Sequence, residues 1–261
     1  MILAIDIGNT HTVIGIFNGG KLLGDWRVTS FVTRTEDEFG MLVKQFCDDA
    51  KVPLKKITSI GISSVVPNLT DVCVRMAQKY FMIDPIVVSS DLDLGIKVLY
   101  DDPRAVGADR LCNAVAGFAK YKGPVVIVDF GTATTFDVVS KNGEYLGGVI
   151  TAGVETTSGE LHRRAAKLPK IDLKFPDKII GKNTVESMQA GIMYGALDSM
   201  ETMIRRISKE LDDYPTVIAT GGFSEMMKRQ SKVINKHEPT LVLDGIRLIV
   251  ERVEKMNKRK K

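Results

Sequence analysis

Apolar and polar positions along the chain fall into blocks with two different spacings. Residues 2–24 give an apolar strand, a turn, a second strand rich in β-branched residues, a Gly-containing hairpin and a third strand. A capping-box signature formed by Thr35 and Glu38 comes next, and an apolar stripe at helical spacing follows it over 39–50, which predicts a helix. The rest of the first half predicts a strand at 57–62, a helix at 69–80 and a strand at 85–88.

The second half of the chain repeats this order. Residues 125–133 can be laid over residues 2–10 at an offset of 123 without a gap. The same offset pairs Thr12 with Thr135, Gly20 with Gly143, Leu23 with Leu146 and Gly24 with Gly147. After three strands, the pattern predicts helices at 154–167 and 185–207, a strand at 216–220, a short helix, a strand at 241–243 and a final helix.

Each half therefore predicts the order β-β-β-α-β-α-β followed by a helix. Such an order indicates an α/β fold with a mixed sheet and helices on its faces, built twice. A chance match between two short segments is the alternative, but the identities together with the shared element order favour a duplication. We predict two domains, residues 1–121 and residues 122–261.

The composition is that of an ordinary globular protein, with 44% hydrophobic and 26% charged residues among 261. Five cations near the C-terminus account for the net charge of +4, because 31 cations remain against 32 anions without them. A terminal cluster is typical of a solvated helix end and not of a basic binding face, so no nucleic-acid partner is expected. The cluster consists of Lys255, Lys258, Arg259, Lys260 and Lys261.

Cysteine spacing and apolar runs indicate the compartment. Cys47, Cys73 and Cys112 are widely spaced and lie in apolar helical patterns, so we interpret them as buried residues of a reducing environment. No run of about 18 apolar residues is present, and the first residues lack the features of a secretory signal. We therefore predict a cytoplasmic protein with no membrane partner.

Two Asp-x-Gly turns, related by the repeat, carry the first chemical signal. Asp6 and Asp129 each end an apolar strand, and a Gly with several hydroxyl residues follows. Gly allows a tight turn, and the neighbouring amides and hydroxyls form a cradle suited to phosphate oxygens. A carboxylate at a strand end can also hold Mg²⁺ through water. A strand ending in Gly221-Gly222 gives backbone that can approach a nucleobase or ribose; a plain strand-to-helix turn is the alternative.

This combination resembles the actin-like ATPase class, which includes sugar and acetate kinases. Within that class, four motifs in the expected order over residues 1 to about 250 resemble those of type III pantothenate kinases. The motifs are Asp6-Ile7-Gly8-Asn9-Thr10, Gly107-Ala108-Asp109-Arg110-Leu111 with Asn113-Ala114, Asp129-Phe130-Gly131-Thr132-Ala133-Thr134-Thr135, and the segment from Gly181 to Gly191. The resemblance implies two ribonuclease-H-like domains.

The resemblance also implies a reaction and a set of binding partners. Members of this family transfer phosphate from ATP to the primary hydroxyl of pantothenate, the first step of coenzyme A synthesis. They use Mg²⁺ and a monovalent cation, K⁺ or ammonium, and form a homodimer through the second domain.

The resemblance assigns roles to individual residues. Asp109 is the implied general base, Arg110 the group that binds the pantothenate carboxylate, and Asp129 the ligand of the monovalent cation. The implied ATP-binding residues are Asp6, Ile7, Gly8, Asn9, Thr10, His11, Thr12, Val13 and Thr132. The implied pantothenate-binding residues are Tyr100, Gly107, Ala108, Asp109, Arg110 and Thr184.

The residues themselves agree with these roles. A carboxylate such as Asp109 can accept the proton of an attacking alcohol, and the guanidinium of Arg110 matches a substrate carboxylate. An exposed helix-start pair, with Asp109 as a cap, is the alternative interpretation. We interpret Glu155, Glu160 and Glu186 as solvated or dimer-facing.

Two other functions are kept as hypotheses. The first is a catalytically weak regulatory or transcription accessory protein, which only the basic tail supports. The second is a kinase of the same class with another acceptor. The segments 107–110 and 181–184 discriminate, because they would form the acceptor site.

Overall fold

A computed structural model describes residues 1–259, and its contacts divide the chain into two compact units. Unit 1 comprises Met1–Lys120 and the segment that starts at Leu241, and unit 2 comprises Tyr121–Thr240. The first boundary lies one residue from the predicted one, but the C-terminal segment packs with unit 1 and not with the second half. Of the predicted basic tail, Lys260 and Lys261 lie outside the described residues.

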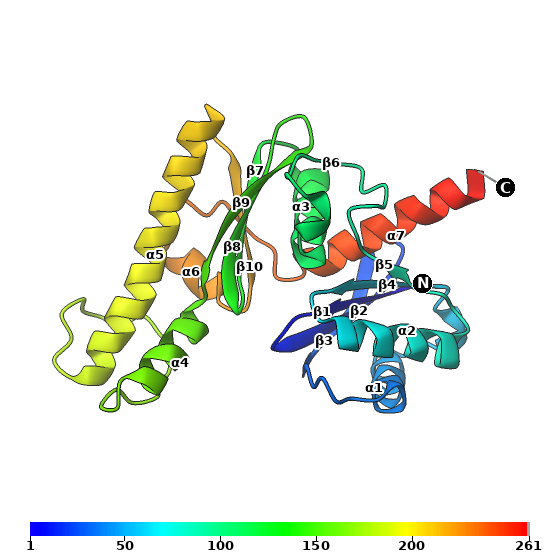
Figure 1. Cartoon of the computed structure of the whole chain (residues 1–261), viewed down its shortest axis with the longest axis horizontal. Coiled ribbons are helices and arrows are strands. Elements are labelled where there is room, and N and C mark those ends of the chain that lie inside the picture. The colour runs from blue at the N-terminus through cyan, green and yellow to red at the C-terminus, as the bar shows by residue number, and fades with distance from the viewer. Residues whose placement is uncertain (260–261) are drawn as a thin grey trace. The chain divides into compact units, whose positions relative to one another are not determined.

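Unit 1 holds a five-stranded sheet between two helical layers (Figure 1). The strand order is β3-β2-β1-β4-β5, with β1 antiparallel to β2 and parallel to β4. Helices α1 and α2 cover one face, and α7 contacts β1, β2 and β4 on the other. The elements are β1 (Ile2–Ile7), β2 (His11–Asn18), β3 (Lys21–Thr29), α1 (Glu36–Asp49), a 3₁₀ turn (Leu54–Lys56), β4 (Ser59–Ser64), α2 (Pro67–Phe81), β5 (Ile86–Val87), β6 (Lys97–Val98), a 3₁₀ turn (Pro103–Ala105), α3 (Ala108–Tyr121) and α7 (Leu241–Arg259).

Unit 2 repeats the topology, with the strand order β9-β8-β7-β10-β11. Helix α5 packs its apolar stripe against β7 and β8, together with α4. The elements are β7 (Val125–Phe130), β8 (Ala133–Val139), β9 (Glu144–Ala152), α4 (Val154–Arg164), α5 (Thr184–Leu211), β10 (Thr216–Gly221), α6 (Ser224–Gln230) and β11 (Lys236–His237). The predicted α/β class with two ribonuclease-H-like sheets is confirmed.

Local signals in the sequence account for several element boundaries. The capping box of Thr35 and Glu38 is present at the start of α1, with both reciprocal hydrogen bonds formed. The predicted strand at 241–243 is wrong, because these residues form the first turn of α7. Leu241 and Leu243 are buried together with Ile246 and Ile249, and three apolar residues alone do not reveal a helical period.

Close packing explains why α7 joins unit 1. A Cβ atom on Gly61 of β4 would lie 2.5 Å from the Ile246 side chain. A Cβ atom on Gly245 would lie 2.1 Å from the carbonyl oxygen of Cys112 in α3. Glycine at both positions lets α7 approach β4 and α3 more closely than any other residue would allow.

The register of the hairpins refines the gapless repeat. Asp6 of β1 pairs with Val13, whereas Asp129 of β7 pairs with Thr135. The second strands therefore correspond at an offset of 122, so that Thr12 corresponds to Thr134 and not to Thr135. The hairpin between β8 and β9 is one residue longer than the hairpin between β2 and β3, because three residues separate Ser140 from Glu144 whereas two separate Asn18 from Lys21. The third strands therefore correspond again at the offset of 123.

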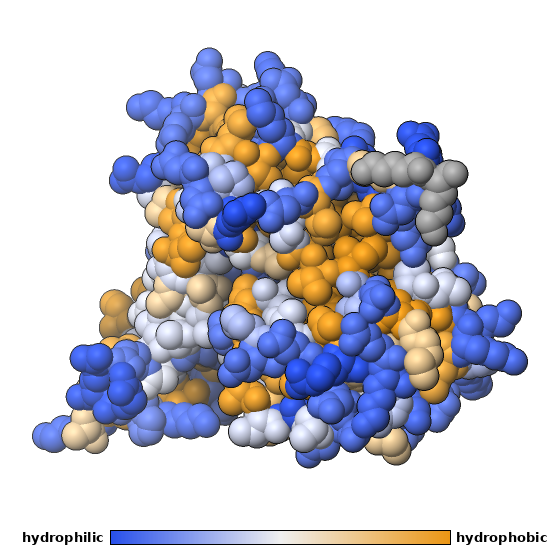
Figure 2. All heavy atoms as spheres, turned by 45° about the vertical axis from the view of Figure 1, so that its right-hand side comes forward, coloured by the Kyte–Doolittle hydropathy of each residue, from blue (hydrophilic) through white to orange (hydrophobic). Residues whose placement is uncertain are grey.

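The surface is mostly polar. Figure 2 shows hydrophilic residues over much of one face, with apolar side chains gathered between them. The most exposed large apolar side chains include Val32 and Met82 in unit 1 and Ile150, Ile179, Ile180 and Tyr214 in unit 2. Within residues 1–259, no helix is both long and apolar enough to cross a membrane.

Candidate active site

The turn between β1 and β2, residues 8–11, is called phosphate loop 1 here. The amide of Gly8 donates to the carbonyl of His11 at 3.0 Å and closes the turn. Ser30, which follows β3, donates its amide to the carbonyl of Thr10 at 3.0 Å, and its hydroxyl lies 2.8 Å from that of Thr12. The loop is thus held from the third strand while Asn9 and Thr10 stay exposed.

The predicted ATP-binding stretch has exposed and buried members. Asn9 and Thr10 are exposed, so their side chains can reach a ligand. Ile7 and Thr12 are 1% and 2% exposed, and the Ile7 side chain belongs to the core of unit 1. Ile7 can therefore contact a nucleotide only through its backbone. The remaining predicted members, Asp6, Gly8, His11 and Val13, are half-buried.

The carboxylate of Asp6 ends β1 beside the parallel strand β4. The hydroxyl of Ser63 donates to Asp6 Oδ1 at 2.8 Å, and Ser63 is fully buried. Because Asp6 and Ser63 stand opposite each other in the register of the two strands, the sheet itself fixes this contact. Ser63 thus orients one oxygen of the carboxylate.

The second group in unit 1 lies at the start of α3. Oδ1 of Asp109 accepts a hydrogen bond from the backbone amide of Arg110 at 2.8 Å. Burial raises the pKa of Asp109 above its ordinary value of 3.8, although the Arg110 amide and guanidinium act in the opposite direction. A carboxylate that is harder to ionise is also a stronger proton acceptor once it is ionised. The side chain of Arg110 is 8% exposed.

Gly107 leaves room for this carboxylate. A Cβ atom at position 107 would lie 2.5 Å from Asp109 Oδ1, far inside van der Waals contact. In the motif Gly107-Ala108-Asp109-Arg110, a residue larger than glycine at position 107 would therefore displace the Asp109 carboxylate from its observed position. Ala108 is buried and lies in the first turn of α3.

The turn between β7 and β8, residues 131–133, is called phosphate loop 2 here. The amide of Gly131 donates to the carbonyl of Ala133 at 3.1 Å. The carbonyl of Thr132 accepts two hydrogen bonds, from the amide of Gly153 at 3.1 Å and from the hydroxyl of Thr156 at 2.6 Å. Both donors belong to the start of α4, so this helix holds the loop.

Asp129 lies next to the Gly-Gly turn that ends β10. Gly221 pairs with Phe130 in the parallel register and has φ of +87°. A Cβ atom on Gly221 would lie 2.4 Å from Asp129 Oδ1 and 2.7 Å from the amide nitrogen of Phe130. Ser224 fixes this turn. Its hydroxyl donates a hydrogen bond to the carbonyl of Gly221 at 2.6 Å and also lies 2.9 Å from Nε2 of His237.

Two predicted pantothenate-binding residues lie apart from the start of α3 in the sequence. Tyr100 is 36% exposed and lies between β6 and the second 3₁₀ turn of unit 1. Thr184 is the first residue of α5 in unit 2 and is exposed. The structure therefore brings together Gly107, Asp109 and Arg110 within unit 1, whereas Thr184 belongs to the other unit.

Glu186 has a structural contact in the same segment. Its carboxylate accepts from the amide of Lys182 at 2.9 Å, and its own amide donates to the side chain of the N-cap residue Asn183 at 2.9 Å. The residue thus fixes the entry into α5. Glu160 forms ion pairs with Arg163 and Arg164 on the exposed side of α4.

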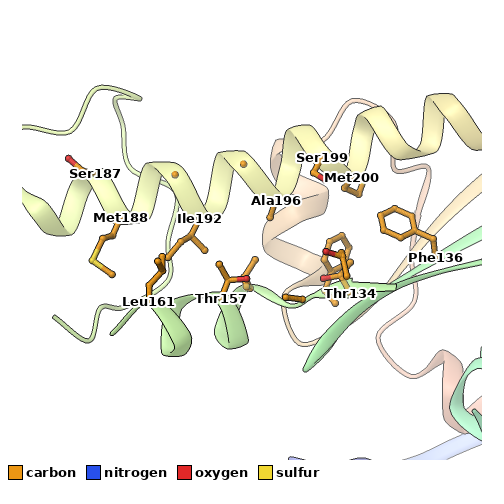
Figure 3. Close-up of a pocket in the computed structure, with 16 residues that line it drawn as sticks. Thr134, Phe136, Thr157, Leu161, Ser187, Met188, Ile192, Ala196, Ser199 and Met200 are labelled. Atoms are coloured by element: carbon orange, nitrogen blue, oxygen red, sulfur yellow. The ribbon is translucent and has the colours of Figure 1, made fainter. Parts of the chain in front are cut away.

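An apolar groove of about 410 Å³ lies in unit 2 between α4, α5 and the strands β7, β8 and β9 (Figure 3). Thr157 and Leu161 of α4 face Ile192 and Ala196 of α5 across it. Two glycines of α5, Gly191 and Gly195, line the groove, and a Cβ atom on either would meet nothing within 4 Å. The groove therefore has open space along one side of α5.

Sequence reasoning missed the residues that support the loops. Ser63, Ser30, Gly153 and Thr156 carry no motif of their own, and each acts through a residue distant in the sequence or through a backbone atom. The one available signal for Ser63 is that it directly follows the strand predicted at 57–62.

Three comparisons with known proteins bear on this site. The family model described as type III pantothenate kinase matches residues 2–206. A curated protein named type III pantothenate kinase from Geobacter sulfurreducens is 46% identical over 97% of this chain and 99% of its own length. Another with the same name, from Bacillus cytotoxicus, is 45% identical over 97% of this chain and 96% of its own.

Solved structures share the fold at lower identity. The activator of the 2-hydroxyisocaproyl-CoA dehydratase from Clostridium difficile, solved with bound ADPNP, superposes with a TM-score of 0.61 at 12% identity. The superposition covers the whole of this chain and 98% of the activator. At this identity the likeness shows the fold alone, which is that of the actin-like ATPases and related sugar kinases.

Proposed function

Because the chain belongs to the type III pantothenate kinase family, we propose that it transfers the γ-phosphate of ATP to the primary hydroxyl of pantothenate, the first step of coenzyme A biosynthesis. The proposal is supported over nearly the whole chain by relatives at 44–46% identity. The cytoplasm stays the predicted location.

One observation carries the mechanism, namely the half-buried carboxylate of Asp109 at the start of α3. Phosphoryl transfer depends mainly on positioning and on charge neutralisation, so the protein needs one group to accept the proton of the attacking hydroxyl. Asp109 is oriented by the Arg110 amide, and burial raises its pKa toward the range where a general base works best. In the step, the hydroxyl oxygen bonds to the γ-phosphorus, its proton moves to Asp109, and ADP leaves.

The other predicted residues take supporting roles. The guanidinium of Arg110 binds the carboxylate of pantothenate, with Tyr100 and Thr184 as further contacts of this substrate. Phosphate loop 1 and Thr132 of phosphate loop 2 bind the phosphates of ATP through exposed amides and hydroxyls. Gly221 and Gly222 offer bare backbone to the nucleoside.

The residues also fit the ions that the family implies. Among residues 1–259, no three His, Cys, Asp or Glu side chains gather into a metal-binding group. Mg²⁺ in kinases uses one or two carboxylates, with phosphates and waters as its other ligands, so a single Asp6 suffices. Asp129 beside the bare backbone of Gly221, where a Cβ atom would intrude, suits a monovalent cation, K⁺ or ammonium. When bound, these ions neutralise phosphate charge.

The experiment that tests the function measures ADP release by the purified protein with ATP and pantothenate, with and without K⁺ or ammonium. We expect pantothenate-dependent, cation-stimulated release that falls by about two to four orders of magnitude in Asp109→Asn. Asp71→Asn, an exposed carboxylate on α2, is the matched control. Absence of pantothenate-dependent release from a folded protein that binds ATP would contradict the proposal and favour another acceptor.

We also propose a homodimer formed through unit 2, with the groove between α4 and α5 as part of the interface. Gly195→Arg directs a long cation into the groove from a position where a Cβ atom meets nothing within 4 Å, and it removes a glycine from a helix, which favours folding. We expect this variant to sediment as a monomer while the wild type sediments as a dimer. Thr202→Arg, on the same helix outside the groove lining, should stay dimeric; a wild type that is monomeric at all concentrations would refute the proposal.

A further inference from the structure

The carbonyl oxygen of Thr132 in phosphate loop 2 has an unusually well-defined environment. It accepts from the amide of Gly153 at 3.1 Å and from the hydroxyl of Thr156 at 2.6 Å. The first of these bonds continues the antiparallel ladder between β8 and β9. The second comes from the first turn of α4 and is not part of any ladder.

Phosphate loop 1 has an equivalent arrangement. The amide of Ser30 donates to the carbonyl of Thr10 at 3.0 Å, which is the counterpart of the bond between Gly153 and Thr132. A hydroxyl is again added, but here it is the Ser30 hydroxyl and it contacts Thr12. Each copy thus supports its loop with a hydroxyl from the segment after the third strand, using different residues and different partner atoms.

Fixing this carbonyl also fixes the neighbouring amide. The C=O and N–H groups of one trans peptide plane point in opposite directions. Because the Thr132 carbonyl is held toward α4, the N–H of Ala133 is directed away from α4. An amide N–H that is already oriented is a better phosphate donor than one that must be ordered on binding.

The exposure of Thr156 indicates that its hydroxyl contributes to the geometry of the loop more than to the stability of the fold. Its side chain is exposed, so the hydroxyl would be hydrated if the bond to Thr132 were absent. An exposed neutral hydrogen bond contributes little net stability. Geometry of the loop, and not stability of unit 2, is therefore the property that the Thr156 hydroxyl controls.

We propose that Thr156 is a positioning residue for nucleotide binding, which holds phosphate loop 2 in the conformation that receives ATP phosphates. This inference rests on the proposed kinase function. It adds α4 to the ATP-binding machinery, because the first turn of this helix is hydrogen-bonded to the loop.

The test compares Thr156→Val, which keeps the shape of the side chain and removes the hydroxyl, with Thr156→Ser, which keeps the hydroxyl. We expect Thr156→Val to raise the KM for ATP and the Kd for a non-hydrolysable ATP analogue by about three- to tenfold. The KM for pantothenate and the thermal midpoint should not change. Thr156→Ser should return both nucleotide constants to within about twofold of the wild type.

Thr202→Val on α5 is the control for an exposed helical Thr→Val change. Wild-type analogue binding in Thr156→Val would overturn the inference, as would equal rises in both KM values or a lowered thermal midpoint. Calorimetric binding of the analogue needs no acceptor. A wild type that binds the analogue but does not phosphorylate pantothenate would therefore refute the proposed function and leave the Thr156 comparison valid.

Discussion

The two phosphate loops share equivalent main-chain hydrogen bonds but differ by one residue in length and in their side chains. Gly8 and Gly131 close the two turns with equivalent amide-to-carbonyl bonds, and Ser30 and Gly153 anchor them with a second equivalent pair. The burial patterns of β1 and β7 are identical along all six residues. A duplicated hairpin thus keeps its main-chain hydrogen bonds while the residues around them change.

The differences extend to the strands β2 and β8 that follow the loops. Gly15 of β2 faces Leu22 and the Leu243 side chain of α7. At the corresponding place, unit 2 has a fully buried Asp137 that accepts from the hydroxyl of Tyr145 at 2.8 Å. A buried carboxylate needs such partners, whereas glycine needs only a neighbour that fills the space. The comparison shows that the main-chain contacts of the loops are kept although one of the following strands carries a glycine and the other a buried carboxylate at the same position.

The largest expected effect comes from giving Gly153 the Cβ atom that its counterpart Ser30 already has. A Cβ atom on Gly153 would lie 2.2 Å from the carbonyl oxygen of Gly131 and 2.7 Å from that of Thr132, and backbone atoms cannot move aside cheaply. We expect Gly153→Ala to lower the free energy of unfolding by about 3 kcal/mol and to weaken ATP binding strongly. Urea unfolding and calorimetry measure both quantities.

Ser30→Ala is the matched change in the other copy, and it should cost less than about 1 kcal/mol. Equal losses of stability in the two variants would break the comparison. They would mean that the structure accommodates the Cβ atom at position 153 without a severe clash.

The next effect separates two glycines that each adjoin an aspartate. A Cβ atom on Gly107 would come too close only to the carboxylate oxygen of Asp109, whereas one on Gly221 would come too close to both Asp129 and the backbone of Phe130 at positive φ. We expect Gly107→Ala to lower kcat by about 10²-fold, because the carboxylate is displaced by about 1 Å, with little change in the thermal midpoint. Gly221→Ala should lower the midpoint as well.

Steady-state kinetics and thermal unfolding of the two variants give the answer. If Gly107→Ala lost as much stability as Gly221→Ala, the Asp109 carboxylate would be unable to move aside for the new Cβ atom. Position 107 would then be structural and not specific to the reaction.

Much of this architecture was predictable from the sequence, because apolar spacing reveals strands and helices. The repeat placed Asp6 and Asp129 at equivalent strand ends, as the registers confirm. The pattern could not show that the second turn is one residue shorter, since the hairpin between β8 and β9 is one residue longer and restores the offset. It also could not assign α7 to unit 1, because that depends on close approach at Gly61 and Gly245.

The candidate site divides in the same way. Motifs identified Asp109 and Arg110, whose contact is local in the chain. Ser63 lies 57 residues from Asp6 in the sequence, and its contact with Asp6 forms only because β4 pairs with β1. Contacts made by parallel strands and by helix starts need three-dimensional information that neither spacing nor composition contains.

A smaller effect is expected for the buried hydroxyls beside the two aspartates. Ser63 stands opposite Asp6, and Thr220 stands opposite Asp129, so that the sheets place a hydroxyl next to each carboxylate. Ser63→Ala removes a 2.8 Å bond to Asp6, and we expect the Mg²⁺ concentration for half-maximal activity to rise about fivefold. Thr220→Val should instead alter the response to K⁺ or ammonium. Each variant is titrated with Mg²⁺ and with K⁺ or ammonium. If both variants changed the concentration required of the same ion, the two aspartates would not bind different ions.

The smallest expected effect concerns stability and not rate. Burial raises the pKa of Asp109 above its ordinary value of 3.8, so the folded state binds a proton more tightly than the unfolded state. Stability of the wild type therefore falls as the pH rises from the unfolded pKa through the folded pKa, and the deficit persists at neutral pH. The amide introduced by Asp109→Asn carries no charge, so we expect this variant to have a thermal midpoint at pH 7 that is equal to or above that of the wild type. This excess should shrink as the pH falls toward 3.8.

Thermal unfolding across this pH range checks the sign of the Asp109 effect, with Asp71→Asn as the control for net charge. A midpoint of Asp109→Asn below that of the wild type at pH 7 would mean that the attraction of Arg110 outweighs burial. In that case the carboxylate would stabilise unit 1 instead of being held there at a cost to folding.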